Sequence, residues 1–296
     1  MPADQLSYDV VDVFTHRPFA GNALAVVHGS RGLPTSALQD IAREFNLSET
    51  TFPVPVDRHT YEVRIFTPGN EVPFAGHPTV GTAWVLRERG DLADGAVLQR
   101  CAAGDVGVLA TPQGARLSAR ARELGAPLER PVLLTEVGVD EADLRSPVRA
   151  ASCGLGFVYV RVSPDAVRRS HAISTAFSFP PTGTGDPLGG ICVYAVEPSV
   201  EPLQVLARVF CPEMGVPEDP ATGSAAAGLG LVLVAEGLAA SDATTSYTIS
   251  QGEQVGRPSR LECEVEASGG VGTMAHVGGG VQPVARGTLV RPRTTP

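Results

Sequence analysis

Two similar stretches of the chain place a titratable side chain beside the glycine and proline residues of a turn. The first spans residues 64–83 and carries His77, and the second spans residues 208–225 and carries Asp219. From Arg64 onward the residue types match at an offset of 144, and removing two residues from the second copy aligns His77 with Asp219. Because this offset is close to half of the 296 residues, the pattern predicts an internal duplication.

Each stretch is typical of an apolar strand, a proline-containing loop and a helix that begins with small residues. The first turn of a helix has unpaired backbone N–H groups and a partial positive charge, so it attracts a carboxylate. If a pseudo-two-fold axis relates the two copies, His77 and Asp219 would lie on opposite walls of one cleft between domains. The alternative is two turns that need glycine and proline for geometry alone.

Glu49 is a further candidate because it lies among apolar and hydroxyl-bearing residues, in Leu47-Ser48-Glu49-Thr50-Thr51-Phe52. A carboxyl group held in an apolar pocket has a raised pKa, as general acid/base catalysis near neutral pH requires. A residue that faces outward from a strand is the simpler interpretation, and the residues by themselves leave both open.

The elements that must position these residues are two unusually apolar helices and many short strands. The helices are expected over residues 80–88 and 224–236, and the second is apolar on every side, as a helix buried on every side would be. Short strands with glycine turns surround them, so the predicted fold class is α+β. It has two similar domains, each a curved β-sheet or barrel wrapped around one buried helix.

The domain boundary is expected within the polar segment 121–131. This gives an N-terminal domain over residues 1–126 and a C-terminal domain over residues 127–296. Whether the tail 285–296 returns to complete the N-terminal domain stays open at this point.

The composition narrows the class of function. A net charge of −9 and a pI near 5.2 argue against binding to nucleic acid or to an anionic membrane. The first residues do not resemble a signal peptide, and no apolar run approaches the length of a membrane span, so we expect a cytoplasmic protein.

Metal and cofactor sites are not expected. The six histidines show no zinc-like spacing, and the five cysteines form no C-x-x-C motif. The glycine-rich segment 177–190 does not match a dinucleotide-binding motif, and neither a phosphate-binding loop nor a G-x-S-x-G motif occurs. The prediction is a site with no metal and no cofactor.

Four segments together resemble the phenazine-biosynthesis PhzF-like family, and the resemblance extends from about Asp12 to Gly287. They are Phe19-Ala20-Gly21-Asn22, Ser48-Glu49-Thr50, Gly76-His77-Pro78-Thr79 and the long, specific segment from Pro217 to Ala225. The resemblance implies a diaminopimelate-epimerase-like fold with the site between two domains, and a homodimer. The best-understood members isomerise a dihydro-3-hydroxyanthranilate by moving a proton, without a cofactor.

The resemblance also implies residue roles. Glu49 would be the general acid/base, while His77, Asp219 and Ser224 would hold the substrate and assist the proton transfer. Gly76 and Gly223 would supply backbone donors to a substrate carboxylate. Related epimerases use a pair of cysteines, which the matching segments here lack, so a two-cysteine racemase is disfavoured.

Three functions are therefore weighed. The first is a cofactor-independent isomerase that moves a proton on a small unsaturated carboxylate, in antibiotic or other secondary-metabolite biosynthesis. The second is an epimerase or racemase of an amino-acid-like compound that uses the same Glu49 and Asp219. The third is a non-catalytic dimer that binds a small molecule, which the intact set of titratable residues disfavours.

Overall fold

The computed structural model describes residues 4–128, 132–177, 179, 185–197, 200–212 and 215–292. Its contacts divide the chain into two compact units, which we call unit 1 (residues 1–117 and 278–296) and unit 2 (residues 118–277). The division falls after Leu117, so residue 126, where the sequence placed the boundary, lies inside unit 2. In the described ranges, no helix is both long and apolar enough to cross a membrane.

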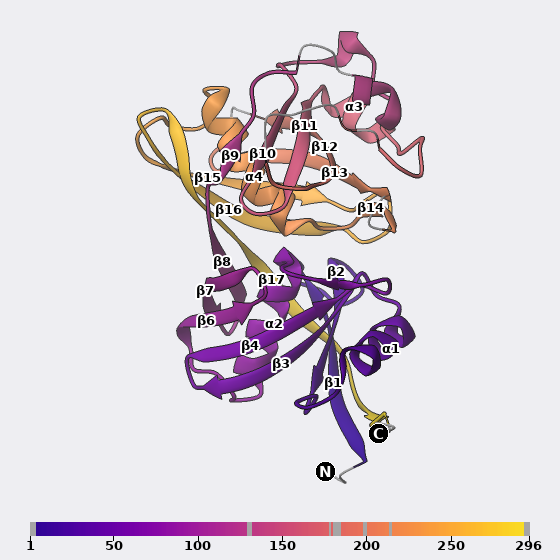
Figure 1. The fold of residues 1–296 in the computed structure, drawn as a ribbon. Helices are drawn as coiled ribbons and strands as arrows, with labels where there is room; N and C mark the ends of the chain where they lie inside the picture. The colour runs from indigo at the N-terminus through magenta and orange to yellow at the C-terminus, as the bar shows by residue number, and fades with distance from the viewer. Residues whose placement is uncertain are drawn as a thin grey trace. The chain divides into compact units, whose positions relative to one another are not determined.

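Unit 1 consists of strands around one central helix (Figure 1). Its elements in chain order are β1 (Gln5–Val13), β2 (Asn22–His28), α1 (Thr35–Phe45), β3 (Glu49–Asp57), β4 (Thr60–Phe66), β5 (Glu71–Val72), α2 (Gly76–Glu88), β6 (Gly95–Cys101), β7 (Gly104–Thr111) and β8 (Gly114–Arg120), followed by the last part of β17 (Val271–Val290). Paired neighbours follow the order β17–β1–β2–β3–β4–β6–β7, and β8 also pairs with β17.

Unit 2 repeats this plan. Its elements are β9 (Glu123–Leu124), η1 (Val132–Val137), η2 (Glu141–Asp143), β10 (Arg149–Ser152), β11 (Gly156–Arg161), α3 (Pro164–Arg169), β12 (Leu188–Glu197), β13 (Leu203–Cys211), β14 (Val216–Asp219), α4 (Gly223–Ala235), β15 (Thr244–Gln251), β16 (Ser259–Ser268) and the first part of β17. Paired neighbours follow the order β9–β10–β11–β12–β13–β15–β16.

The connections between strands show that the two units have the same topology. In unit 1 the parallel pairs β2–β3 and β4–β6 are joined through α1 and α2. In unit 2 the parallel pairs β11–β12 and β13–β15 are joined in the same way through α3 and α4. The predicted α+β fold class, with each sheet wrapped around a buried helix, is confirmed.

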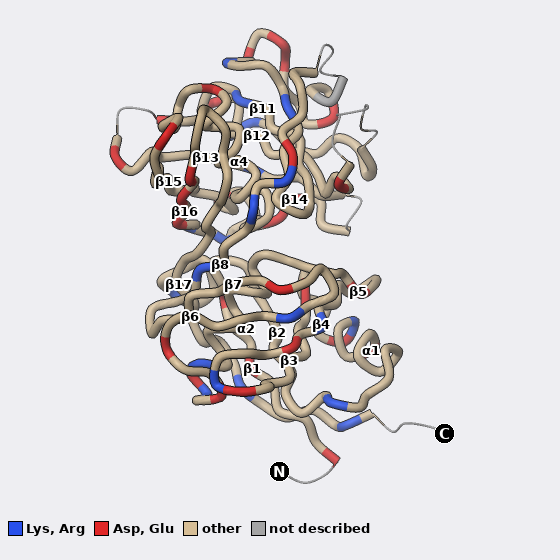
Figure 2. Tube along the Cα trace, turned by 60° about the vertical axis from the view of Figure 1, so that its left-hand side comes forward, with Lys and Arg blue, Asp and Glu red and all other residues tan. Residues whose placement is uncertain are grey.

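The two central helices are buried because their sequences offer no polar face. All residues from Gly76 to Leu86 in α2 are buried, and in α4 only Ser224 and the last residue are not. The α4 sequence contains no Lys, Arg, Asp or Glu, the residues coloured blue and red in Figure 2. The close fit depends on glycine, since a Cβ at Gly228 would lie 2.3 Å from the Tyr159 hydroxyl oxygen. That hydroxyl donates a 2.8 Å hydrogen bond to the Ala225 carbonyl in the first turn of α4.

A repeated side-chain arrangement supports the equivalence of β4 and β13. Arg64 forms a bidentate ion pair with Glu71, and Arg208 forms the same pair with Glu218. Each guanidinium also lies over a phenylalanine ring of its own strand, at 5.1 Å for Phe66 and 5.2 Å in the second copy. The Arg–Glu pair therefore closes the same strand–loop unit in both halves.

These anchors correct the sequence alignment of the two copies. Glu218 lies 147 positions after Glu71, and α4 begins 147 positions after α2, so unit 2 has three more residues before its helix, rather than two fewer. His77, the second residue of α2, is consequently equivalent to Ser224. Asp219 is equivalent to Val72, which is not titratable. The predicted equivalence of His77 and Asp219 is therefore wrong.

The start of α2 also differs from the sequence expectation, since the helix begins at Gly76 and not at residue 80. Pro78 lies in its first turn, where a missing N–H removes no hydrogen bond because those N–H groups have no partner within the helix. His77 is thus on the first turn of a buried helix and not in a loop.

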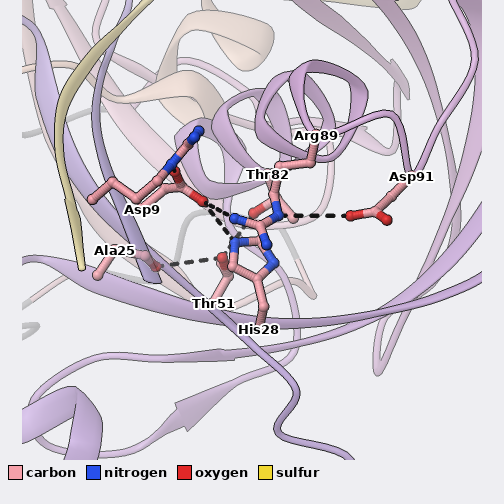
Figure 3. Close-up of polar contacts among 8 residues, drawn as sticks. Asp9, Ala25, His28, Thr51, Thr82, Arg89 and Asp91 are labelled. Carbon is pink, nitrogen blue, oxygen red and sulfur yellow. Dashed lines mark hydrogen bonds and ion pairs between the residues drawn. The ribbon is translucent and has the colours of Figure 1, made fainter. Parts of the chain in front are cut away.

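The last strand answers the question that the sequence left open. Residues Val281–Val290 of β17 pair antiparallel with Gln5–Val13 of β1, which places Arg286 opposite Asp9. Figure 3 shows the buried carboxylate of Asp9 with the basic groups around it. Arg286 Nε lies 2.6 Å from Oδ1, while His28 Nε2 and Arg89 Nη1 lie 2.9 and 3.0 Å from Oδ2. This cluster joins β17, β1, β2 and the C-terminal end of α2.

Candidate functional site

Glu49 is the first residue of β3, where this strand runs parallel to β2 beside Leu24. Its side chain is largely buried, with 12% of its surface exposed. The outward-facing position weighed in the sequence analysis is therefore excluded. Two residues later, the Thr51 hydroxyl lies 2.8 Å from that of Thr82 on α2 (Figure 3). This buried contact ties the strand of Glu49 to the helix of His77.

His77 faces Glu49 from the first turn of α2. The Nε2 atom of His77 lies 3.4 Å from Glu49 Oε2, and the imidazole is 5% exposed. Nε2 makes no hydrogen bond with any described residue, and the ring is hydrogen-bonded to the backbone of Ala23. Because Nε2 makes no hydrogen bond, the hydrogen bond with the Ala23 backbone involves Nδ1.

Burial decides the protonation state of His77. Burial of the ring lowers its pKa to about 3, although the hydrogen bond with Ala23 acts in the opposite direction. At neutral pH the ring is uncharged, with the Nδ1 proton directed to the backbone and the Nε2 lone pair facing Glu49. A neutral imidazole in this tautomer can accept a hydrogen bond at Nε2 from the protonated carboxyl group of Glu49.

The lowered pKa of His77 predicts an acid-sensitive fold. The unfolded chain binds a proton at His77 near pH 6.5, whereas the folded chain does so only near pH 3. The free energy of unfolding therefore decreases as the pH falls between these values. The slope attributable to His77 approaches about 1.4 kcal/mol per pH unit. Urea unfolding of wild type and His77→Gln from pH 7 to 5 measures it, with the exposed His59 replaced in a control variant. Equal slopes in wild type and His77→Gln would contradict this.

The segment before β2 supports the Glu49–His77 pair. Asn22 is 2% exposed, and its side-chain oxygen accepts a 3.0 Å hydrogen bond from Ser48, the residue before Glu49. Phe19 has a positive φ of 63°, and its N–H donates a 2.6 Å bond to the Asp12 carboxylate. The Phe19-Ala20-Gly21-Asn22 segment thus enters β2 in one fixed conformation, next to the backbone that binds His77.

Unit 2 carries the other predicted residues close together in its own fold. Asp219 is half-buried at the end of β14, which pairs with β13 beside Val209. Gly223 and Ser224 are the first two residues of α4, and Ser224 is half-buried. Asp219 accepts a 2.6 Å hydrogen bond from the hydroxyl of Thr222, which lies directly before the helix.

Both central helices begin without a side-chain cap. The residue before α2 is Ala75 and the residue before α4 is Thr222, and neither side chain accepts a hydrogen bond from the first turn. The N–H groups of Gly76 and Gly223 are among those that a helix cannot pair internally. With the partial positive charge of the helix end, they suit a carboxylate oxygen.

Sequence reasoning missed several residues that contact the candidate residues within each unit. Ala23 acts through its backbone, which leaves no signal in the sequence. Thr222 lies within the recognised motif but was assigned no role, and Gln251 at the end of β15 was not singled out. Gln251 donates to the Asp219 carbonyl and to Thr222, and only the folded chain brings these residues together.

Among the described residues, no three His, Cys, Asp or Glu side chains are grouped to hold a metal ion. The expected lack of a metal and a cofactor stays a prediction.

Known proteins match this chain over the residues described above. Residues 11–285 match the family model for phenazine biosynthesis-like proteins, PhzC-PhzF. An isomerase of Mesorhizobium japonicum, named as uncharacterized, is 36% identical, over 96% of this chain and 98% of its own. The trans-2,3-dihydro-3-hydroxyanthranilate isomerase of Pseudomonas fluorescens is 31% identical, over 96% of this chain and 99% of its own.

A solved structure gives the same result for the fold. It is that of a protein named as a predicted epimerase of Pseudomonas aeruginosa, which is 31% identical, with a TM-score of 0.75 over 96% of this chain and 98% of its own. The match of the family model and these relatives extend over nearly the whole chain. The chain therefore belongs to the phenazine biosynthesis-like (PhzC-PhzF) protein family.

Proposed function

We propose that this protein is a cofactor-independent isomerase that moves a proton on a small unsaturated carboxylate such as trans-2,3-dihydro-3-hydroxyanthranilate. The observation that carries the proposal is the buried pair of Glu49 Oε2 and His77 Nε2, 3.4 Å apart. The relatives named as isomerases of that compound support the substrate class. A homodimer, which the family resemblance implies, and a cytoplasmic location, which the sequence led us to expect, belong to the same proposal.

Glu49 is the proton carrier in this mechanism. Its carboxylate takes a proton from a carbon next to the unsaturated system of the substrate, and the electrons of the broken C–H bond enter that system. The same carboxyl group then returns the proton to another carbon, so the double bond moves and no electron leaves the molecule. General acid/base catalysis of this kind contributes about 10²–10⁴-fold to a rate.

His77 stabilises the protonated form of the carrier. After Glu49 takes up the proton, its O–H can donate to the Nε2 lone pair, which the low pKa of His77 keeps available at neutral pH. A protonated imidazole would remove this acceptor. The pair can thus hold one proton between them while the substrate is a carbanion.

The helix starts and Asp219 hold the substrate. The N–H groups of Gly76 and Gly223 offer donors for the carboxylate and for the negative charge that develops during proton transfer. Asp219 and Ser224 provide an acceptor and a hydroxyl for the amino and hydroxyl groups of the substrate. Each of these side-chain assignments can be tested by a single substitution.

Turnover by the purified chain tests the proposal. We expect conversion of trans-2,3-dihydro-3-hydroxyanthranilate to an isomer with a moved double bond, observed by ¹H NMR and unchanged by a chelator. An unmoved double bond with inversion at one carbon would instead support an epimerase, a function that the name of the similar Pseudomonas aeruginosa protein favours. Binding without any turnover would leave the non-catalytic alternative and reject the isomerase.

A further inference from the structure

Thr222 lies at the N-cap position of α4 but does not cap the helix. Threonine is favoured at this position because its side-chain oxygen accepts a hydrogen bond from the first turn, at a gain of about 1 kcal/mol over alanine. Here no such bond is present, and the Thr222 hydroxyl instead donates to Asp219 Oδ2 at 2.6 Å. The Thr222 hydroxyl thus contacts one carboxylate instead of capping the helix.

Gln251 completes a closed set of hydrogen bonds around this contact. Gln251 is 2% exposed, and its Nε2 donates to the Asp219 carbonyl at 2.7 Å and to Thr222 Oγ1 at 3.0 Å. Its Oε1 accepts the Thr222 backbone N–H at 3.4 Å. Because a carbonyl only accepts, Nε2 must face Asp219, and the amide can take only this orientation.

The direction of the Thr222 proton follows from these bonds. A threonine hydroxyl has one proton to donate, and its oxygen already accepts from Gln251. The proton is therefore directed at Asp219 Oδ2, which restrains the carboxylate in one rotamer. Of the three residues, only Asp219 is half-buried, while Thr222 and Gln251 are buried behind it.

The turn after β15 is shaped to bring Gln251 into place. Gly252 has a φ of +82°, and a Cβ there would lie 2.5 Å from the Pro220 carbonyl oxygen and 2.4 Å from that of Arg257. Only glycine fits this close approach without a shift of the backbone. The turn therefore packs directly on the residue that follows Asp219.

Unit 1 has a similar Gln–Thr pair with a different end point. Gln99 Nε2 donates to Thr79 Oγ1 at 2.9 Å, but that hydroxyl donates to the Ala75 carbonyl at 2.9 Å. In unit 1 the relay therefore ends on the backbone at the start of α2. Of these two relays, the one in unit 2 ends on a carboxylate that belongs to the candidate site.

We propose that Gln251 and Thr222 are positioning residues, which fix the Asp219 carboxylate for the substrate. This inference rests on the proposed function, in which Asp219 contacts the substrate. Loss of the Thr222 hydroxyl would remove one hydrogen bond that orients the carboxylate, and the effect would appear in kcat rather than in folding. Hydrogen bonds to charged groups of this kind correspond to about a 10–100-fold change in rate.

The test compares variants on the isomerase assay with trans-2,3-dihydro-3-hydroxyanthranilate. Thr222→Val and Gln251→Leu are expected to lower kcat about 10–100-fold. Thr222→Ser should restore most of the rate because it keeps the hydroxyl. Tyr247→Phe is the control, since Tyr247 donates a 2.8 Å bond to the Ala226 carbonyl of the same helix without contact to Asp219. Its kcat should stay near wild type.

A double-variant comparison separates positioning from general damage. In an Asp219→Asn background, Thr222→Val should have little further effect on kcat, because the Asp219 carboxylate through which Thr222 acts is already absent. An equal effect in both backgrounds, or a wild-type kcat for Thr222→Val, would overturn the positioning role. Full activity of Asp219→Asn would instead overturn the proposed function at Asp219. Crystal structures of Thr222→Ser and Gln251→Leu, which can be solved without turnover, should show Asp219 held in the first and turned in the second.

Discussion

Replacement of Glu49 by Gln is expected to lower kcat by about 10²–10⁴-fold, the range for loss of a general acid/base. Glutamine has the size of glutamate but cannot take up and return a proton. Its side-chain NH₂ group can donate to His77 Nε2, which is 3.4 Å from Glu49 Oε2 in the wild-type chain. We therefore expect the fold and the affinity for ligand to be largely preserved, so that the loss falls on kcat and not on KM.

A matched substitution on the next strand controls for the loss of one negative charge. Glu62 lies on β4 with its side chain exposed, so Glu62→Gln changes the same functional group away from His77. Its kcat should stay within about twofold of wild type, because a surface substitution changes stability little. Retained turnover by Glu49→Gln would remove Glu49 from its proposed role.

Replacement of Asp9 by Asn is expected to destabilise the chain by about 3–5 kcal/mol, as removal of one partner from a buried ion pair typically does. Asp9 is 4% exposed and faces three basic side chains, one from each of β2, β17 and the end of α2. Without the carboxylate, the largely buried His28 and the more exposed Arg89 and Arg286 would be held together with no negative charge between them. Urea unfolding at pH 7 measures the loss.

The control for Asp9 is a carboxylate beside the same arginine. Asp91 Oδ2 lies 3.8 Å from Arg89 Nε, and its side chain is 41% exposed, so Asp91→Asn should cost less than about 1 kcal/mol. If Asp9→Asn were no more costly than Asp91→Asn, the cluster would not be what holds β17 on unit 1.

The pH dependence of the Asp9 contribution has a definite sign. Burial raises the pKa of Asp9, but the hydrogen bonds and charges of His28 and Arg286 outweigh it and hold the pKa well below its usual range. The contribution is therefore fully present above about pH 4, the value for an unfolded aspartate, and is lost as the pH falls below it. The His77 effect begins at higher pH, so the two can be separated.

The sequence predicted the features that depend on local pattern. The run of alanine, leucine and valine in α4 has no polar face, and it predicted both the helix and its burial. The start of α2 could not be predicted in the same way. Pro78 indicates a turn unless its place in the first helical turn is known, and the shift moved His77 from a loop onto the helix.

Features that depend on distant partners were not available from the sequence. Asp9 and Arg286 meet only because β17 pairs with β1, and no period in the sequence predicts that register. The contact of Gln251 with Asp219 likewise requires the turn at Gly252. The sequence motifs were enough to nominate Glu49 and His77 as candidates, but the equivalence of His77 and Ser224 required the folded units.

Proton transfer in D₂O, followed by ¹H NMR, tests the central claim most directly. Wild-type protein incubated with trans-2,3-dihydro-3-hydroxyanthranilate should give an isomer with a moved double bond, and it carries deuterium at the receiving carbon in those turnovers in which the Glu49 proton exchanges with solvent before it is returned. Glu49→Gln should give neither the isomer nor carbon-bound deuterium. Exchange and isomerisation by Glu49→Gln at the wild-type rate would contradict the account that Glu49, supported by His77, carries the proton.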